Sequence, residues 1–458
     1  MNNKLEKILS NTIANKRVLI LGFGKEGRST SRVLTGIGGY ASIDVADENP
    51  AVSADIPPSA NYIGGEYMDV LGNYDIIFKT PGIALQQSAD NIGGRICSQM
   101  DTFLSAYSAQ TIGITGTKGK STVATLMHHV LETAGRETIL AGNIGTPVFD
   151  IAEQMTTSAM AVVEMSCHQL EHCGHSPSYA VLLNIYEDHL DHYGTFERYA
   201  NAKTNIYNHQ SANDTLYARL GDLPIKVCAK SRIREVAVSD LPFSRFKDIG
   251  DVKLQGQHNL LNAAFVYDVC KDIGIGDEAF ITALRTFAPL RHRLEYIGIK
   301  NGIDYYDDSI STTAESTICA VESVPNAKTL IIGGMDRGID YEKLVDFLLG
   351  SDLSLIIGMY ESGKRIRDIY NSRIDADGAA YADRRLADGG SVPDGEIAYS
   401  GSRAVRFVYA DDLNKAADIA QKQTPQGTAC ILSPAAASYG NFTNFEQRGD
   451  AYRKLLFG

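Results

Sequence analysis

Three features are missing from this 458-residue sequence, and each absence argues against a class of protein. None of the seven cysteines forms a C-x-x-C pair, which disfavours a disulfide framework and favours reduced thiols that are mostly buried as small apolar residues. No stretch approaches the ~20 apolar residues that a membrane span requires, and residues 1–17 lack the apolar segment and cleavage site of a secretion signal. We therefore expect a cytoplasmic protein that does not insert into membranes.

The sequence also lacks an excess of basic residues. Lysine and arginine together number 43 against 55 aspartates and glutamates, which gives a formal charge of −12. Such a charge repels polyphosphate backbones and anionic membrane surfaces. Nucleic acid is therefore not an expected partner.

What is present is a repeated alternation of buried strands with helical patterns, which predicts an α/β protein. One hydrophobic core seldom organises more than about 250 residues, so we predict three domains at 1–97, 98–290 and 291–458, each a mostly parallel sheet flanked by helices. Strands are expected at RVLIL, ASIDVAD and YDIIF, then at QTIGIT, ETILAGN, SAMAVVEM and YAVLLNI, and finally at TLIIGG, LSLIIG, RFVYA and TACILS. Residues 371–402 lack apolar periodicity and predict a surface excursion.

The predicted central domain carries a phosphate loop. In GITGTKGKST, residues 113–122, the glycines allow backbone N–H groups to wrap a triphosphate, Lys120 reaches the outer phosphates, and Ser121 or Thr122 can ligate Mg²⁺. Ile114 stands where the strict G-x-x-x-x-G-K-[ST] pattern has glycine, so the loop is a variant of that pattern. Strand, loop and helix follow in the order of a P-loop ATPase-like domain.

Candidate metal ligands follow the phosphate loop. Glu164 ends a buried strand, where a carboxylate suits a hard cation such as Mg²⁺. Acid and imidazole groups that suit a second metal come later, at Asp188, His189, Asp191 and His192. Lys203 comes after them, and the sequence alone predicts that it is exposed near the start of a helix.

HQLEH, residues 168–172, also matches the H-x-x-E-H pattern of a zinc peptidase. His168 and His172 lie one helical turn apart and could share a face. Two histidines at this spacing are more often solvated or at the edge of a core, which is the interpretation we favour.

Three further features have alternative interpretations. Asn259 and Asn262 are one turn apart and suit an adenine edge, although Asn259 is also placed to cap a helix. Arg293 could swing onto phosphates or be an ordinary surface arginine. GFGKEG, residues 22–27, contains the G-x-G-x-x-G pattern that alone would suggest NAD.

Over nearly its whole length the chain resembles the Mur ligase family. The motifs that carry the resemblance occur in the family's order: GITGTKGKST, AGNIGTP, EMSCHQLE, LNIYEDHLDHYGTFERYANAK, GQHNLLNA, HRLE, YDDSISTT, GGMDRG and SPAAASYGNFTNFEQRGDAY. The resemblance implies a Rossmann-like first domain that binds UDP, a central domain that binds ATP, and a Rossmann-like third domain that binds an amino acid.

The resemblance also implies roles for individual residues. The UDP-substrate set is Phe23, Gly24, Lys25, Asp47, Thr80, Pro81, Gly82, Asn143 and His189. The ATP set is Gly116, Thr117, Lys118, Gly119, Lys120, Ser121, Thr122, Asn259, Asn262, Arg293 and Asp308. The glutamate set is Thr312, Arg337, Ser438, Tyr439 and Phe445. Two Mg²⁺ ions are implied at Ser121, Glu164, His189 and Lys203, with Lys203 carbamylated by CO₂, and the catalytic set is Lys120, His189, Lys203 and Arg293.

The implied activity is ATP-dependent addition of D-glutamate to UDP-N-acetylmuramoyl-L-alanine through an acyl-phosphate intermediate, in cytoplasmic peptidoglycan precursor synthesis, by a monomer. An L-glutamate-specific ligase of the same family is the alternative. Two departures from the family concern the amino acid: Ile310 replaces a lysine of the common D-S-K-A-T-N motif, and Arg337 stands where a lysine often grips the side-chain carboxylate. Whether D- or L-glutamate is used stays open. Cys167 and His168 replace the serine and phenylalanine common in the family, which explains the apparent zinc motif as a local substitution.

Three rival classes account for fewer of the motifs. A folylpolyglutamate synthase lacks the UDP-binding first domain that GFGKEG indicates. A nicotinamide oxidoreductase would leave GITGTKGKST without a use. A noncatalytic nucleotide-binding module would leave the second metal cluster and Arg293 unexplained.

Overall fold

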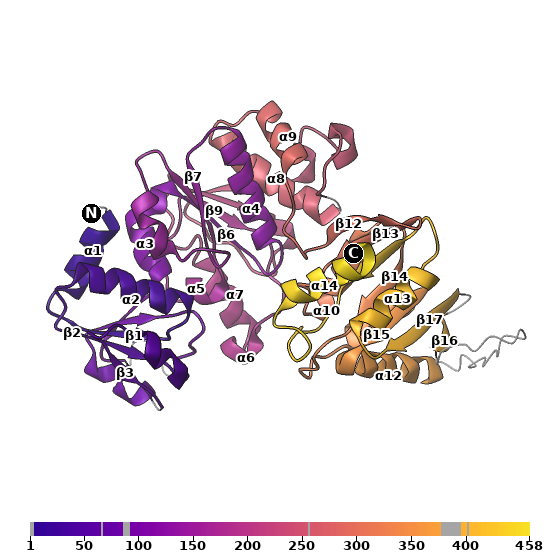
Figure 1. Cartoon of the computed structure of the whole chain (residues 1–458). Helices are drawn as coiled ribbons and strands as arrows, with labels where there is room; N and C mark the ends of the chain where they lie inside the picture. The colour runs from indigo at the N-terminus through magenta and orange to yellow at the C-terminus, as the bar shows by residue number, and fades with distance from the viewer. Residues whose placement is uncertain (1–3, 66, 86–91, 255–256, 377–394, 401–402) are drawn as a thin grey trace, which may run out of the picture. The chain divides into compact units, whose positions relative to one another are not determined.

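Three sheets, each built from a separate stretch of the chain, form the frame of the protein (Figure 1). The computed structural model describes residues 4–65, 67–85, 92–254, 257–376, 395–400 and 403–458. The chain divides into two compact units, Met1–Val252 with Asn259–Phe287, and Lys253–His258 with Ala288–Gly458. The first unit contains two sheets and the second contains one. The finer division into domains at residues 97 and 98 stays a prediction.

The first sheet is parallel throughout, with strand order β3-β2-β1-β4-β5. Its strands are β1 (Arg17–Leu21), β2 (Ser42–Ala46), β3 (Asn61–Ile63), β4 (Ile76–Lys79) and β5 (Arg95–Cys97). The helices that go with it are α1 (Lys4–Ile13), α2 (Lys25–Ile37) and α3 (Gln99–Tyr107), with 3-10 turns η1 (Pro50–Asp55) and η2 (Tyr67–Asn73). Both faces of β1 are buried, since Val18 and Ile20 join one core cluster while Leu19 and Leu21 join another.

The second sheet is also parallel, with strand order β11-β10-β9-β6-β8-β7. Its strands are β6 (Thr111–Thr115), β7 (Thr138–Gly142), β8 (Met160–Glu164), β9 (Tyr179–Leu182), β10 (Thr215–Ala218) and β11 (Arg232–Glu235). Its helices are α4 (Lys120–Thr133), α5 (Cys167–Leu170), α6 (Leu190–Tyr193), α7 (Phe196–Thr204), α8 (Gln257–Asp272) and α9 (Asp277–Thr286). Short 3-10 turns complete it: η4 (Ser108–Gln110), η5 (Val148–Gln154), η6 (Leu220–Asp222), η7 (Val238–Asp240) and η8 (Phe246–Ile249). Because β8, β6 and β9 are parallel neighbours, the loops that follow them leave the same edge of the sheet.

The two sheets of the first unit share one continuous core. The carboxylate of Asp150, in η5, accepts a hydrogen bond from Ser29 Oγ at 2.8 Å and pairs with Arg32 at 2.8 Å, so it is bound to α2. Behind this polar contact, Phe78 of β4 and Phe149 of η5 meet edge to face with ring centroids 6.3 Å apart. These contacts bring the carboxyl ends of β4 and β8 into one unit.

The third sheet is mixed, with strand order β12-β13-β18-β14-β15-β17-β16. Its strands are β12 (Glu295–Lys300), β13 (Ile303–Asp307), β14 (Ala327–Ile332), β15 (Leu355–Met359), β16 (Gly395–Ser400), β17 (Arg403–Ala410) and β18 (Ala429–Leu432). Its helices are α10 (Ala314–Ser323), α11 (Glu342–Gly350), α12 (Tyr360–Ala376), α13 (Leu413–Gln423) and α14 (Phe445–Phe457). Only the edge strands β12 and β16 run antiparallel among the described strands.

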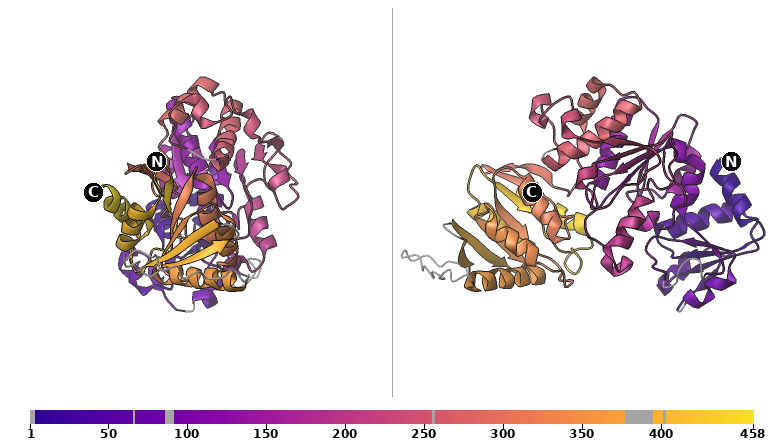
Figure 2. Two further views of the ribbon diagram at one scale, coloured as in Figure 1. Left: turned by 90° about the vertical axis from the view of Figure 1, so that its right-hand side faces the viewer. Right: turned by 180° about the vertical axis from the view of Figure 1, so that it is seen from behind.

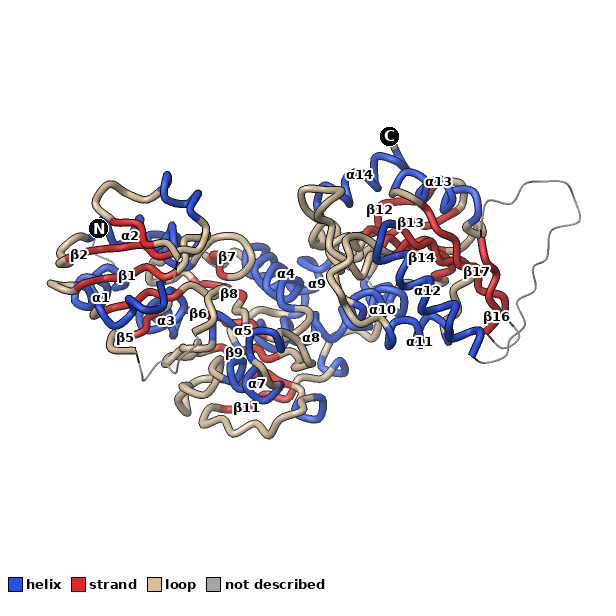
Figure 3. The backbone as a smooth tube through the Cα atoms, turned by 90° about the horizontal axis from the view of Figure 1, so that it is seen from below, coloured by secondary structure: helices blue, strands red, loops and turns tan. Residues whose placement is uncertain are grey.

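Helices cover both faces of this third sheet (Figures 2 and 3). Leu330 and Ile332 of β14 pack in a cluster with α10, α11 and α12, whereas Ile331 packs in a cluster with α13 and α14. The predicted class, three mostly parallel sheets flanked by helices, is confirmed.

Two local predictions were wrong. The predicted surface excursion at 371–402 begins inside α12, which continues to Ala376, and it includes β16, because that stretch completes its backbone hydrogen bonds antiparallel to β17. Residues 377–394 and 401–402 of the excursion lie outside the described residues. The strand predicted at YDIIF, residues 74–78, instead spans Ile76–Lys79 as β4.

The cysteines and the membrane prediction are also addressed by the structure. All seven cysteines are free thiols, of which Cys228 and Cys319 are exposed and the other five are buried. Among the described residues, no helix is both long and apolar enough to cross a membrane.

Candidate active site

The phosphate loop connects β6 to α4, as its sequence predicts. Gly116 and Gly119 both adopt positive φ, at 156° and 87°. A Cβ on Gly119 would lie 2.8 Å from Oδ1 of Asn262, and one on Gly116 would lie 2.9 Å from Cβ of Leu183. Backbone conformation and space therefore both require glycine at these two positions.

Asn184, which the sequence analysis did not single out, holds this loop in shape. Its Oδ1 accepts the backbone N–H of Thr117 at 3.1 Å and of Lys118 at 2.8 Å, and its Nδ2 donates to the carbonyl of Lys118 at 3.1 Å. Asn184 follows β9, which pairs with β6 in the sheet. An amide that directly follows a buried strand was the signal available in the sequence.

Two lysines meet at the start of the loop. Lys120 Nζ donates to the carbonyls of Gly116 at 2.9 Å and Thr117 at 3.0 Å, and Lys203 Nζ donates to the same Gly116 carbonyl at 3.0 Å. Burial, and next the charge of Lys120, lower the pKa of Lys203 to about 8.

The predicted location of Lys203 was wrong, because it lies in the last turn of α7 and is only 1% exposed. The helix begins earlier than predicted, since the side chain of Thr195 caps it by accepting the N–H of Arg198. Tyr199, one turn before Lys203, presents its ring to the amine at 4.7 Å and its hydroxyl to Thr117 Oγ1 at 2.8 Å. Helix α7 thus brings a lysine to the phosphate loop from the interior.

Glu164, at the end of β8, is 1% exposed. Its Oε1 accepts a hydrogen bond from Asn143 Nδ2 at 2.8 Å, whereas its buried Oε2 has no hydrogen-bond partner among the described residues. A buried carboxylate oxygen without a hydrogen-bond donor is suited to bind a cation, and a hard oxygen ligand suits Mg²⁺.

A cavity of about 290 Å³ lies beside this group. Its lining combines predicted members of the UDP-substrate, ATP and metal sets with residues assigned to none of them: Pro81, Gly82, Lys120, Asn143, Ser166, Cys167, His168, Asp188, His189, Tyr199 and Lys203. His189 enters the cavity from a positive-φ position, at 53°, with its Nε2 atom 3.8 Å from Asp188 Oδ2. One cavity therefore gathers groups from both sheets of the first unit.

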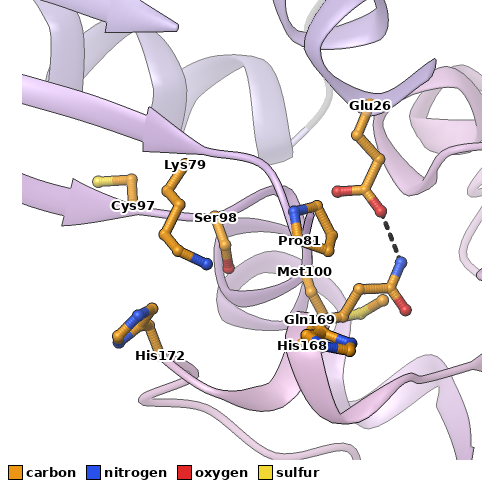
Figure 4. A pocket seen from close by; sticks show the side chains of 9 residues that line it. All are labelled: Glu26, Lys79, Pro81, Cys97, Ser98, Met100, His168, Gln169 and His172. Atoms are coloured by element: carbon orange, nitrogen blue, oxygen red, sulfur yellow. Dashed lines mark hydrogen bonds between the residues drawn. The ribbon is translucent and has the colours of Figure 1, made fainter. Parts of the chain in front are cut away.

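The H-x-x-E-H pattern does not form a peptidase site. Helix α5 ends at Leu170, so His172 lies beyond it, and Figure 4 shows His168 and His172 on different sides of a small pocket. Glu171, the glutamate of the pattern, pairs with Lys79 and His192, each at 3.4 Å. The favoured interpretation of HQLEH as a structural segment agrees with these contacts.

The same pocket joins α2 to α5. Glu26 accepts a hydrogen bond from Gln169 Nε2 at 2.6 Å, and burial raises the pKa of this carboxyl (Figure 4). Burial likewise lowers the pKa of Lys79, which is opposed by the carboxylate of Glu171. None of these residues was assigned a role from the sequence.

Members of the UDP-substrate set meet at the carboxyl ends of β1, β2 and β4. Asp47 accepts the N–H of Phe23 at 2.6 Å and of Asn49 at 2.8 Å. Thr80 Oγ1 donates to the carbonyl of Leu21 at 3.0 Å, and a Cβ on Gly22 would lie 2.1 Å from that hydroxyl oxygen. Gly24 and Lys25 begin α2, and Pro81 and Gly82 continue into the cavity.

The predicted adenine group lies beside the phosphate loop. Asn259 is the third residue of α8, and its Oδ1 accepts a hydrogen bond from Asn262 Nδ2 at 2.9 Å. Both amides are buried. Asn262 is also the residue that approaches Gly119, so α8 lies directly behind the loop.

In the second unit, Asp308, Thr312, Arg337 and Ser438 lie in loops that follow the neighbouring strands β13, β14 and β18, whereas Arg293 precedes β12. Asp308 follows β13 and accepts hydrogen bonds from Leu294 N at 3.0 Å and Ser433 Oγ at 2.7 Å, while burial raises its pKa to about 6. Arg293 is half-buried, and its Nε has no hydrogen-bond partner among the described residues.

The glutamate set occupies the same edge of the third sheet. Met335 N donates to the carbonyl of Ala437 at 2.9 Å, which joins the loop bearing Arg337 to the loop bearing Ser438 and Tyr439. Arg337, Thr312 and Tyr439 are exposed, Phe445 is half-buried and Ser438 is buried.

Arg448, which the sequence analysis missed, holds these loops together. Its guanidinium is fully buried and donates to the carbonyls of Ser309 at 2.6 Å and Ala436 at 3.1 Å. Burial lowers its pKa to about 10. Arg448 lies within the motif SPAAASYGNFTNFEQRGDAY, but nothing in that motif distinguishes a buried arginine from one on the surface of α14.

A glycine-rich loop at a helix N-terminus, a lysine folded onto it and an unpartnered carboxylate define a nucleotide-binding α/β protein of the P-loop class. Comparison with known proteins narrows this class. Residues 114–239 match the Mur ligase middle domain. A protein of Streptococcus gordonii named UDP-N-acetylmuramoylalanine--D-glutamate ligase is 30% identical over 472 residues, covering 96% of this chain and 97% of that protein. A protein of the same name from Clostridium botulinum is 28% identical over 479 residues, covering 97% of each.

Solved structures agree in fold. The MurF ligase of Thermotoga maritima in complex with ADP has a TM-score of 0.56 at 16% identity and covers 100% of this chain and 99% of that one. MurF of Acinetobacter baumannii has a TM-score of 0.57 at 12% identity and covers 98% of each chain. The chain belongs to the Mur ligase family.

Proposed function

We propose that the protein is an ATP-dependent ligase that joins D-glutamate to UDP-N-acetylmuramoyl-L-alanine and releases ADP and phosphate, a step of peptidoglycan precursor synthesis. The observation that carries the proposal is the composition of the cavity, in which Pro81 and Gly82 of the UDP-substrate set lie with Lys120, Lys203 and His189. The name of the Streptococcus relative supports the choice of substrates. We also propose that the protein acts as a monomer, and the use of ATP supports a cytoplasmic location.

The residues present fit the Mg²⁺ that an ATP-dependent ligase requires. Glu164 Oε2 is a buried oxygen without a hydrogen-bond partner among the described residues, and Ser121 is the second residue of the helix that follows the phosphate loop. We propose that Glu164 and Ser121 hold one ion and that His189 and Lys203 hold a second. When bound, these ions would neutralise charge on the transferred phosphoryl group.

Lys203 would become a metal ligand by carbamylation. An amine attacks CO₂ only when it is neutral, and the lowered pKa of about 8 gives Lys203 a substantial neutral fraction near physiological pH. The amine loses a proton as its nitrogen bonds to the carbon of CO₂, which leaves an N-carboxylate. The product replaces a buried cation next to Lys120 with an anion, so repulsion between the two side chains becomes attraction.

The proposed reaction has two steps. A carboxylate oxygen of the alanyl group attacks the γ-phosphorus of ATP, the bond from that phosphorus to the β–γ bridging oxygen breaks, and ADP leaves. The free amine of glutamate then attacks the acyl carbon, phosphate leaves, and the amine loses a proton as the amide forms. Lys120 stabilises the phosphoryl oxygens in the first step, and the N–H groups of the phosphate loop orient them.

The second unit would supply the amino acid. We propose that Arg337 binds the side-chain carboxylate of glutamate and that Thr312, Ser438, Tyr439 and Phe445 surround the rest, with Arg293 and Asp308 serving the nucleotide. An exposed guanidinium on a loop suits a bidentate contact with a carboxylate.

The test is a panel of amino acids. Phosphate release is measured with purified protein, ATP, Mg²⁺ and UDP-N-acetylmuramoyl-L-alanine, together with D-glutamate, L-glutamate or L-alanine. Release with D-glutamate alone supports the proposal, whereas release with L-glutamate alone would change the assigned stereochemistry. Activity with none of the three amino acids would overturn the ligase assignment.

A further inference from the structure

Three potential metal ligands of different chemistry converge in the cavity. A thiol and two imidazoles, those of Cys167, His168 and His189, offer ligand atoms that all lie within 4.8 Å of one another. All three residues line the cavity of about 290 Å³. Sulfur and nitrogen donors suit Zn²⁺ and related transition cations, whereas Mg²⁺ prefers oxygen.

The geometry of the first pair is close to that of a tetrahedral site. Cys167 Sγ and His168 Nδ1 lie 3.5 Å apart. With Zn–S near 2.3 Å and Zn–N near 2.05 Å, a tetrahedral angle separates the two ligand atoms by about 3.5 Å. These two atoms could therefore share one cation without moving, and rotation of the half-exposed His189 side chain would bring in the third ligand.

The fold fixes two of the ligands and leaves the third adjustable. Cys167 and His168 are the first residues of α5, whose N-terminus is fixed by a capping box between Ser166 and Gln169. The ring centroid of His168 lies 4.4 Å from the ring centroid of His192 and 4.8 Å from that of His189. Asp188 lies next to His189, where a carboxylate commonly orients a metal-bound imidazole.

A second cluster of potential metal ligands among the described residues differs from the first, because its side chains are occupied by contacts with one another and with neighbouring residues. His292, Glu295 and Asp307 are also close enough to share an ion. There, however, Asp307 is bound to His292 Nδ1 at 2.7 Å and to Ser309 N at 3.0 Å, and Glu295 pairs with Arg453. Those side chains form an internal network, whereas the thiol and imidazoles of the first cluster line an open cavity.

We infer that Cys167, His168 and His189 form a binding site for a thiophilic divalent cation, Zn²⁺ in the first place, with water in the fourth position. The site is distinct in chemistry from the oxygen-donor site at Glu164 but shares His189 with the proposed catalytic set. A bound Zn²⁺ would therefore withhold His189 from the ligase reaction. This second consequence rests on the proposed function, whereas binding itself does not.

Binding is tested with the full-length protein, freed of metal by chelation and kept in excess Mg²⁺ so that oxygen-donor sites are filled. Titration with Zn²⁺ against a chromogenic chelator should give one tight site per chain, and Co²⁺ should give the near-ultraviolet band of a thiolate–cobalt bond. Cys167→Ser and His168→Phe, which introduce the residues common in the family, should weaken Zn²⁺ binding at least about tenfold and, for Cys167→Ser, remove the cobalt band.

Matched controls are Cys228→Ser, which removes an exposed thiol, and His209→Ala, which removes an exposed imidazole. Both should bind Zn²⁺ as the unmodified protein does. Equal Zn²⁺ affinity of the unmodified protein and the Cys167→Ser/His168→Phe double variant would overturn the site, as would loss of binding in the Cys228→Ser control.

Competition is tested separately. In saturating Mg²⁺, Zn²⁺ should inhibit phosphate release by the unmodified protein, and the double variant should keep its basal rate while requiring at least about tenfold more Zn²⁺ for half-inhibition. Equal sensitivity of both proteins would overturn the competition for His189. If no amino acid supports turnover but Zn²⁺ binds with the expected dependence on Cys167, the proposed function fails while the metal site stands.

Discussion

Lys120 and Lys203 donate hydrogen bonds to one acceptor, the carbonyl oxygen of Gly116, at 2.9 and 3.0 Å. Two ammonium groups at a single oxygen repel each other, and this repulsion acts with burial to lower the pKa of Lys203. The arrangement at the phosphate loop therefore favours loss of the charge from one of the two amines.

Carbamylation of Lys203 is the first predicted consequence. With ¹³C-labelled bicarbonate, carbon NMR should show one carbamate resonance that grows as the pH rises through about 8, because the neutral amine is the reactive form. Lys203→Arg should lack the resonance, and the exposed-lysine control Lys230→Arg should keep it. A resonance present in both variants would place the carbamate on another amine.

The same lysine should make stability depend on pH when CO₂ is absent. The pKa of Lys203 falls from its ordinary value of 10.5 to about 8 on folding, so folding expels a proton between these two values. The destabilisation is complete below pH 8 and is relieved as pH rises toward 10.5, since the amine then becomes neutral in both states. Thermal unfolding across this range should show a rise in stability that the Lys203→Met variant lacks, and parallel curves would contradict the prediction.

Lys120→Ala should lower the rate of ADP formation by at least about 100-fold, because it removes a preorganised cation from the transferred phosphoryl group. The loop itself should survive, since Asn184 holds Thr117 and Lys118 through hydrogen bonds that do not involve Lys120. Lys230→Ala is the matched control with an exposed lysine. Near-normal turnover of a folded Lys120→Ala protein would contradict the proposed role.

Glu164→Gln should raise the Mg²⁺ concentration for half-maximal activity by about 10-fold or more, because the unpartnered Oε2 loses its charge. The control is Glu153→Gln, at an exposed glutamate in the same unit. The measurement is a Mg²⁺ titration of phosphate release at fixed ATP. An unchanged Mg²⁺ requirement would remove Glu164 from the metal set.

Arg337→Ala should raise the KM for glutamate by about 10-fold or more while leaving the KM for ATP within twofold, because a charge-assisted hydrogen bond to the side-chain carboxylate contributes roughly 1.5–3 kcal/mol. Lys343→Ala, at an exposed lysine of the same unit, is the control. A loss of kcat with an unchanged KM for glutamate would argue that Arg337 acts elsewhere.

Arg448→Leu should destabilise the protein by about 2 to 5 kcal/mol, because the buried carbonyls of Ser309 and Ala436 would lose their donors. Denaturant unfolding measures this directly, with Arg373→Leu, an exposed arginine of α12, as the comparison. Because Arg448 contacts no proposed ligand, the substitution should alter the KM for glutamate only indirectly, by shifting the loops that Arg448 holds. Equal unfolding midpoints for the two variants would show that these hydrogen bonds contribute little.

Periodicity and motif order predicted the class of fold and the phosphate loop well, because both depend on contacts that are local in sequence. Strands β1, β6 and β14 are rich in buried apolar residues, and the glycines at 116 and 119 are required by backbone conformation. The edge strand β16 was missed because its stability comes from pairing with β17 rather than from its own composition.

The sequence was a poorer guide to the site residues whose partners lie far away along the chain. In the sequence, Lys203 has the features of an ordinary surface lysine. In the structure, α7 places it in the interior, where it contacts a carbonyl that lies 87 positions away in the sequence. Asn184 and Arg448 each lie within a motif that carries the family resemblance, but their roles could not be predicted from it because their hydrogen-bond partners lie on other elements. The structural interpretation favoured for HQLEH agrees with the fold, because α5 ends at Leu170 and does not carry His168 and His172 on one helical face.

The three hydrogen bonds of Asn184 bear on how the protein meets its nucleotide. A loop already held in shape has lost its conformational entropy during folding, so little of the binding free energy is consumed in ordering it. Affinity should then depend on contacts with the phosphates more than on a rearrangement of the loop. A small, rigid polyanion such as triphosphate should therefore bind the loop nearly as well as the nucleotide does.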